Sequence, residues 1–276
     1  MIKHLFFIIA LSCPVLAFSQ DTQPRTGIPD TSYSSRKHIP MAQHVATTDP
    51  IHIYLTGDAR VADHFKTTRP EMGWGTRMTD FFDSTVVIVN KAQNLKRTKV
   101  SEQETVWKSI IDTIRQGDYV LIQAVNLEDG LNDDNYSIGE TVKFRMQKMI
   151  AEAKKKQAIP VLVTPVASRR VQSGKGVATR IKYREMITTL ARKHHVQIID
   201  LTTESRKLFE QFGPDDSRYL FNYLQPGQNP NYPNGSSDDI HLNEFGARKV
   251  AQLVLADLRK LFPDLNNRVV KSSWGK

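Results

Sequence analysis

Two polar segments far apart in the chain carry residue types suited to acid–base chemistry. Asp238 precedes His241 by three residues. A carboxylate that accepts a hydrogen bond from an imidazole orients the ring and stabilises its protonated form, which lets the ring act as a base. Upstream, Ile53 to Ala59 is an apolar strand pattern that runs into a Gly-Asp turn and ends in alanine. Asp238 and His241 are therefore a candidate acid–base pair.

The elements that must position these residues alternate between strand and helix patterns. Short apolar runs suited to buried parallel strands are Ile51 to Leu55, Val86 to Val89, Tyr119 to Val125, Pro160 to Val166 and Gln197 to Leu201. Helical patterns cover Thr105 to Arg115, Thr141 to Lys156, Arg180 to His194 and Asn243 to Leu261. This alternation predicts an α/β fold, with a parallel sheet between two layers of helices.

One long stretch breaks this alternation. Gly213 to Asp239 is rich in proline and glycine, and we expect it to be a loop without secondary structure. Loops of this length inside a compact domain are often functional. This one leads directly to Asp238 and His241, which favours a functional role.

The N-terminus has the pattern of a secretory signal peptide. Lys3 is followed by the apolar run Leu5 to Leu11 and by a small-x-small cleavage pattern at Ala17 to Ser19. The run is too short for a membrane span, so we expect a secreted or periplasmic protein. A lipoprotein anchored through Cys13 is less favoured, because the residues before Cys13 fit lipidation poorly. We expect a signal peptide at 1–19, a flexible leader at 20–49, one domain at 50–262 and a tail at 263–276.

The composition sets further limits on partners. Cleavage after residue 19 removes Lys3 and Cys13, the only cysteine, and leaves 37 Lys and Arg against 29 Asp and Glu, a net charge of +8. A basic exported protein is attracted to polyanions. No element that reads nucleic acid is recognisable, and His194-His195 has no third ligand at metal-site spacing. We expect a monomer with no cofactor and no metal.

Several motifs occur in the order typical of a known superfamily. Asp238-x-x-His241 closes a series of segments that comprises Gly57-Asp58, Val61-Ala62-Asp63, Gly73-Trp74-Gly75, Asn90-Lys91-Ala92, Gly117-Asp118-Tyr119, Thr164-Pro165-Val166 and Ile199-Asp200-Leu201. With them, residues 51 to 260 resemble the SGNH (GDSL-type) hydrolases, and in detail the rhamnogalacturonan acetylesterases. The resemblance implies a flavodoxin-like three-layer α/β/α sandwich with a five-stranded parallel sheet.

The same resemblance implies an ester-hydrolysis site that is incomplete here. In the family, a serine after Gly-Asp attacks the ester carbonyl, and D-x-x-H supplies the acid and the base, which are Asp238 and His241 in this chain. Ala59 occupies the serine position. The oxyanion hole is expected at Ala59, at Asn94 or Leu95, and at Asn126 or Leu127, where leucine cannot donate a hydrogen bond.

Basic and aromatic residues near the strand ends are candidates for ligand binding. The substrate candidates are Lys96, Arg97, Arg169, Arg170 and Trp74. Arginine suits carboxylates, and an aromatic ring can stack on a sugar.

The sequence thus favours a pseudoenzyme that binds acidic or acetylated polysaccharide, and the resemblance implies that this polysaccharide is pectic. The alternative is an active carbohydrate O-acetylesterase that uses His241 and Asp238 with water or with an unrecognised nucleophile.

Overall fold

A five-stranded parallel sheet forms the centre of the domain. The computed structural model describes residues 50–93, 100–123, 136–169 and 175–270. The strand order is β2-β1-β3-β4-β5. The strands are β1 (Ile51–Thr56), β2 (Val86–Asn90), β3 (Tyr119–Gln123), β4 (Ile159–Val163) and β5 (Gln197–Ile199). The predicted α/β fold with a flavodoxin-like five-stranded parallel sheet is confirmed.

Both faces of the sheet are buried, which explains the continuous apolar runs in its strands. Successive side chains of a strand point to opposite faces. Ile53, Leu55 and Leu121 therefore belong to one core cluster, whereas Tyr54 and Val120 belong to the other. The predicted three-layer arrangement follows from these two cores.

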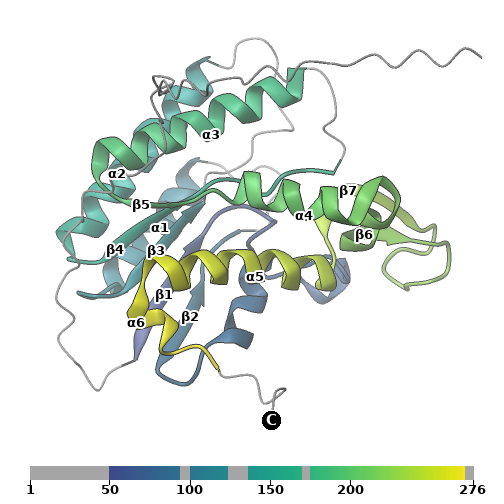
Figure 1. Ribbon diagram of the computed structural model, residues 1–276, viewed down its shortest axis with the longest axis horizontal. Coiled ribbons are helices and arrows are strands. Elements are labelled where there is room, and N and C mark those ends of the chain that lie inside the picture. The colour runs from purple at the N-terminus through teal and green to yellow at the C-terminus, as the bar shows by residue number, and fades with distance from the viewer. Residues whose placement is uncertain (1–49, 94–99, 124–135, 170–174, 271–276) are drawn as a thin grey trace, which may run out of the picture. The chain divides into compact units, whose positions relative to one another are not determined.

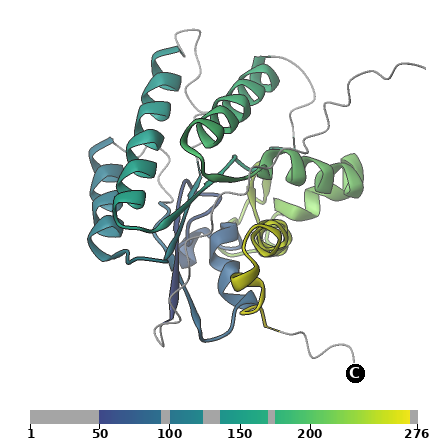
Figure 2. The same cartoon turned by 60° about the vertical axis from the view of Figure 1, so that its left-hand side comes forward.

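Helices cover each face (Figures 1 and 2). One core is completed by α1 (Val100–Thr113), α2 (Tyr136–Lys155) and α3 (Lys175–His194). The other core is completed by η2 (Trp74–Phe81), α4 (Leu201–Asp216) and α5 (Glu244–Leu261). Asn243 caps α5 by accepting a hydrogen bond from the Gly246 amide at 2.9 Å. A Cβ on Gly246 would lie 1.9 Å from the Leu220 carbonyl oxygen, so α5 can pack this closely only with glycine there.

The expected long loop from Gly213 to Asp239 is wrong in most of its length. The helix α4, which was not predicted, runs to Asp216 with a break at Gly213 (φ 77°), and η4 (Ser217–Leu220) follows it. Then β6 (Phe221–Leu224) pairs antiparallel with β7 (Ser236–Leu242). The prolines and glycines are concentrated in the connection between these two strands. The hairpin was not predicted, because its strands are too short and too polar to show a clear alternation of apolar and polar residues.

The domain also extends beyond its predicted end at 262. Helix α6 (Pro263–Asn266) buries Leu265, and Val269 forms a bridge with Phe82. These contacts place 263–270 in the folded domain instead of in a tail. The predicted signal peptide and leader lie outside the described residues, and the export that they imply stays a prediction.

The sheet order fixes where a ligand site can form. Strand β1 lies between β2 and β3, so the connections from β1 and β3 leave on opposite sides of the sheet. A crevice forms at the carboxyl ends of the strands where the connections diverge in this way. The turn after β1, which contains Ala59, lies at this point. Within the described part of the chain, no helix has the length and apolar character needed to cross a bilayer.

Candidate active site

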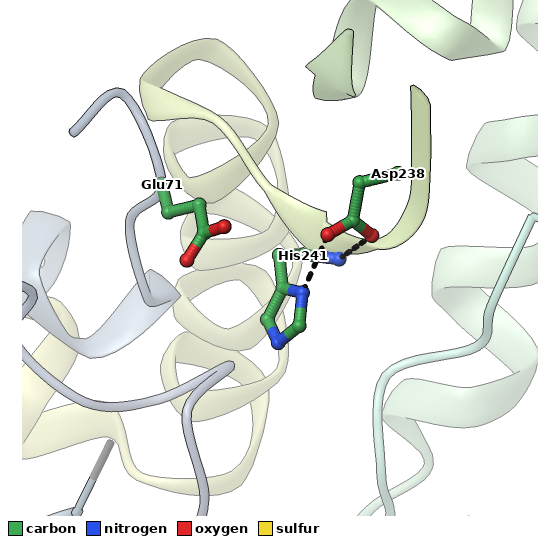
Figure 3. A group of neighbouring side chains, drawn as sticks. All are labelled: Glu71, Asp238 and His241. Carbon is green, nitrogen blue, oxygen red and sulfur yellow. Dashed lines mark hydrogen bonds and ion pairs between the residues drawn. The ribbon is translucent and has the colours of Figure 1, made fainter. Parts of the chain in front are cut away.

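Asp238 and His241 form a hydrogen-bonded pair at the end of β7 (Figure 3). The Asp238 Oδ2 and His241 Nδ1 atoms are 2.7 Å apart. The other oxygen, Oδ1, accepts hydrogen bonds from the backbone amides of Ile240 (2.7 Å) and His241 (2.9 Å). Because an ionised carboxylate can only accept, Nδ1 carries the shared proton and Nε2 remains available as a base. The structure therefore brings the two predicted residues together in the geometry of an acid–base pair.

The electrostatics of the pair favour a charged imidazole. The hydrogen bond that His241 donates to Asp238 is the largest influence and raises the pKa of His241, against the opposing effect of burial. The charge of Glu71 raises it further, and Arg60 lowers it. Burial acts to raise the pKa of Asp238, but the hydrogen bonds from His241 and Ile240 outweigh it and the net shift is downward. The pair is stabilised as carboxylate and imidazolium.

Glu71 is a third member of the site that the sequence reasoning missed. One carboxylate oxygen of Glu71 lies within 4.8 Å of ligand atoms of both Asp238 and His241 (Figure 3). Its Oε1 accepts hydrogen bonds from the Tyr232 hydroxyl (2.8 Å) and from Asn222 Nδ2 (3.3 Å). Burial acts to raise the pKa of Glu71, but the hydrogen bonds from His64 and Tyr232 and the charges of His241 and His64 lower it overall. Glu71 stands between two recognised motifs, and no spacing rule singled it out.

A short segment holds Glu71 between the β1 turn and β7. The Met72 amide donates to the Leu242 carbonyl at 2.9 Å, and the Trp74 amide donates to the Arg60 carbonyl at 2.7 Å. A Cβ on Gly73 would lie 2.3 Å from the Ala62 carbonyl oxygen. The glycine of the Gly73-Trp74-Gly75 motif therefore permits the backbone contact that joins the first strand end to His241.

Ala59 lies in the turn that follows β1. The Asp58 Oδ1 atom accepts hydrogen bonds from the Arg60 amide (3.0 Å) and from Gln123 Nε2 (3.3 Å), which fixes the turn against the end of β3. The Ala59 carbonyl oxygen is 2.7 Å from His64 Nε2. His64 Nδ1 is in turn 3.6 Å from Glu71 Oε2. Ala59 is thus connected to the Glu71–His241–Asp238 cluster through His64.

The side chain of Ala59 is a methyl group, which can neither donate nor accept a proton. Among the described residues, no serine, threonine or tyrosine hydroxyl is hydrogen-bonded to His241. The arrangement therefore has a base and its acid, but no nucleophilic oxygen from the described chain placed against the base. That Ala59 replaces a serine stays a prediction from the motif order.

Two expected substrate contacts are structural instead. Trp74 is fully buried, and its indole N–H donates to Gln123 Oε1 at 3.1 Å. The prediction that it stacks on a sugar is wrong, because neither face of the ring is accessible. Arg169 is committed to the chain itself, with bonds to Asp239 (2.5 Å), Ser217 (3.1 Å) and the Pro214 carbonyl (2.6 Å). These bonds leave the guanidinium poorly placed to hold a uronate.

The remaining predicted residues cannot be placed. Lys96, Arg97, Arg170 and the oxyanion candidates Asn94, Leu95, Asn126 and Leu127 lie outside the described residues. Their expected contributions stay predictions.

A cavity of about 110 Å³ lies at the ends of β1 and β3, and its wall holds three basic residues and the acidic Glu104. Thr56 and Gly57 form part of its wall, and Lys91, Arg145 and Lys148 line it. Burial lowers the pKa of Arg145, while the charge of Glu104 acts in the opposite direction. A partly desolvated cation favours an anionic neighbour.

Metal binding by the Glu71–Asp238–His241 cluster is possible by distance alone. However, Nδ1 of His241 and Oδ2 of Asp238 already share a proton at 2.7 Å. A metal ion on these atoms would have to displace that proton. The geometry is that of a proton-sharing pair, and the expectation of a metal-free site stays a prediction.

Two proteins of Bacillus subtilis are similar to the chain in sequence. The chain is 34% identical to the rhamnogalacturonan acetylesterase RhgT of Bacillus subtilis over 228 residues, which cover 80% of this chain and 95% of the relative. It is 27% identical to the probable rhamnogalacturonan acetylesterase YesY of the same organism over 227 residues, which cover 80% and 98%. No family model matches the chain.

Solved structures share the fold. Protein YxiM of Bacillus subtilis superposes with a TM-score of 0.62 at 25% identity, over 77% of this chain and 57% of that one. The acetylxylan esterase Axe2 of Geobacillus stearothermophilus superposes with a TM-score of 0.52 at 14% identity, over 76% and 94%. A catalytic serine-to-alanine mutant of Axe2 gives 0.51, also at 14% identity and over 76% and 94%. By its sequence relatives, the chain belongs to the rhamnogalacturonan acetylesterase family.

Proposed function

We propose that the protein is an exported member of this esterase family that binds acidic or acetylated polysaccharide and has lost serine-dependent hydrolysis. The observation that carries the proposal is the methyl group of Ala59, together with the absence of any described hydroxyl hydrogen-bonded to His241. Loss of a triad serine costs about 10⁶ in kcat. Binding and the remaining polar groups would leave roughly 10³ over water, which is too little for efficient turnover.

Binding of an acidic polymer is supported by charge at the strand ends. Lys91 and Lys148 are exposed and line the same cavity as the partly buried Arg145. Retention on immobilised polygalacturonan at low salt tests this part of the proposal. Retention should weaken as salt is raised and in the Lys91→Glu/Lys148→Glu variant. The matched control is Lys260→Glu on α5, whose side chain is 73% exposed. Failure of the wild type to bind at low salt rejects the binding proposal.

An active O-acetylesterase is the second candidate, and the intact Asp238–His241 pair favours it. A protein that only binds a polysaccharide needs no oriented imidazole. In this alternative, Nε2 of His241 takes a proton from a water molecule as its oxygen attacks the ester carbonyl, and Asp238 stabilises the imidazolium. Acetate and the free sugar hydroxyl are the products, and the proton passes from His241 to the departing alkoxide.

One set of variants separates the two candidates. We expect wild type to be inactive on an activated acetyl ester and on acetylated pectin, and Ala59→Ser to gain turnover because the new hydroxyl can give its proton to His241. The double variant Ala59→Ser/His241→Ala should again be inactive. Wild-type hydrolysis that disappears in His241→Ala would instead establish the water mechanism. If Ala59→Ser stays inactive in a folded protein, the site lacks more than the serine hydroxyl.

A further inference from the structure

A second cavity lies beside the candidate active site and shares Glu71 with it. Its volume is about 260 Å³, just below the usual range of about 300–1,000 Å³ for small-molecule sites. The residues in its wall come from the segment after the β1 turn, from η2 and from the end of β2; they include Asp63, His64, Arg69, Glu71, Thr76 and Asn90. This size suits a single small ring better than an oligomer.

Two carboxylates in the cavity wall are fixed in place by the protein. Asp63 Oδ1 accepts hydrogen bonds from the Thr76 hydroxyl (2.7 Å) and from Asn90 Nδ2 (3.0 Å). Asn90 Nδ2 also donates to the Val61 carbonyl at 2.9 Å. Glu71 is held in the same manner by Tyr232 and Asn222. Carboxylates that are already oriented lose little freedom when a ligand binds.

The backbone of η2 keeps this arrangement open. A Cβ on Gly75 would lie 2.5 Å from the Val61 carbonyl oxygen and 2.9 Å from Asn90 Nδ2. Any side chain at this position would therefore displace the amide that orients Asp63. Glycine at 75 thus serves the cavity wall as well as the close packing of η2.

The chemistry of the wall selects the kind of ligand. Ionised carboxylates accept hydrogen bonds and so favour hydroxyl donors, while they repel a ligand carboxylate. Arg69 offers donors, the Thr76 and Thr79 hydroxyl oxygens can accept because their protons go to Asp63 and to the Thr76 carbonyl, and Met72 and Ile88 offer apolar contact. A sugar ring combines these needs, because its hydroxyls lie at the edge and its C–H groups form the faces. Asp63 makes no ion pair with another described residue, although Arg69 lies in the same cavity wall.

We propose that this cavity is a subsite for one uncharged sugar ring, adjacent to the His241 pair and distinct from the basic cavity at Thr56 and Gly57. The inference rests on the proposed polysaccharide function. It assigns neutral units of the polymer to the cavity with Asp63 and Glu71, and acidic units to the cavity with Lys91 and Lys148. Glu71 lines the neutral subsite and reaches His241 (Figure 3), so a ring bound there would lie next to the base.

The test compares two ligands that differ in one oxidised carbon. Methyl galactoside and methyl galacturonide are titrated into the full chain, and the backbone amide signals of Gly75, Thr76 and Asn90 are followed by NMR. We expect the galactoside to shift these signals and the galacturonide to bind at least fivefold more weakly. Asp63→Ala should weaken galactoside binding by about tenfold or more, because a charged acceptor is lost. Asp63→Asn keeps an oxygen for Thr76 and Asn90, and should reduce the preference for the neutral ligand.

Controls make failure of the subsite distinct from failure of the proposed function. Asp112→Asn on α1 makes the same charge change at an exposed position and should alter neither affinity. His241→Ala should retain galactoside binding. Galactoside binding without retention on polygalacturonan would reject the acidic-polymer proposal but not the subsite. Unshifted cavity amides at tens of millimolar galactoside, tighter binding of galacturonide, or an unchanged affinity in folded Asp63→Asn and Asp63→Ala would overturn the subsite.

Discussion

At the scale of single residues, His241 is influenced by two carboxylates on different elements. Asp238 bonds to its Nδ1 from the same strand, and Glu71 approaches from the segment after the β1 turn. His64 connects Glu71 to the Ala59 carbonyl. A carbonyl oxygen only accepts, so Nε2 of His64 must carry a proton, and its Nδ1 then faces a carboxylate at 3.6 Å.

Replacing Glu71 by glutamine should lower the pKa of His241. The charge of Glu71 raises that pKa, whereas the uncharged amide of glutamine keeps an oxygen for Tyr232 without the charge. NMR titration of the imidazole signals in wild type and Glu71→Gln measures the shift directly. Glu210→Gln on α4 is the control, since its carboxylate is exposed and pairs with Arg206. An unchanged or higher His241 pKa in Glu71→Gln would show that Glu71 does not act on the ring.

At the scale of elements, the hairpin β6–β7 must be held against the sheet for Asp238 and His241 to reach the strand ends. Arg169, after β4, performs this function. Its guanidinium joins Asp239 of β7 to Ser217 of η4 and to the Tyr223 hydroxyl of β6. The Tyr223 hydroxyl also bonds to Asp239. Arg169, which the sequence suggested as a ligand contact, thus connects the segment after β4 to η4 and to the β6–β7 hairpin.

Arg169→Ala should therefore destabilise the fold. Asp239 is buried, with a side chain that is 5% exposed, and removing Arg169 takes away the cation beside its carboxylate while the Tyr223 hydroxyl bond remains, at a cost of up to about 3–5 kcal/mol. The free energy of unfolding in urea provides the measurement. Arg218→Ala removes an ion pair with the exposed Asp215 and should cost less than about 1 kcal/mol. If Arg169→Ala is as stable as wild type and loses only polysaccharide binding, Arg169 is a ligand contact after all.

At the scale of the whole molecule, the sequence was sufficient for the sheet but not for the cavity walls. Buried parallel strands such as Tyr119–Gln123 are apolar up to their last residue, and the helices between them show a clear period, so the layers could be predicted. The burial of Trp74 and the commitment of Arg169 depend on segments that meet only in the folded chain. Glu71 is near Asp63 in sequence but approaches His241 through backbone contacts to Leu242, which no local pattern encodes.

The Asp238–His241 pair also ties the stability of the whole domain to pH. The pKa of His241 is raised from 6.5, so its contribution is fully present below pH 6.5 and is lost as pH rises through the folded value. The pKa of Asp238 is lowered from 3.8, so its contribution is present above pH 3.8 and is lost as pH falls through the folded value.

The stability that the pair supplies should therefore be greatest between these two limits. Urea unfolding of wild type and His241→Gln from pH 3 to pH 9 provides the test, because glutamine has a similar polar shape but no titrating proton. The difference in unfolding free energy between the two proteins should be largest between about pH 4 and pH 6 and should shrink toward both ends. His195→Gln is the control, since this exposed histidine directly follows α3 and is not part of the β6–β7 hairpin. A difference that stays constant across the range would mean that His241 packs against the hairpin without forming a charged pair.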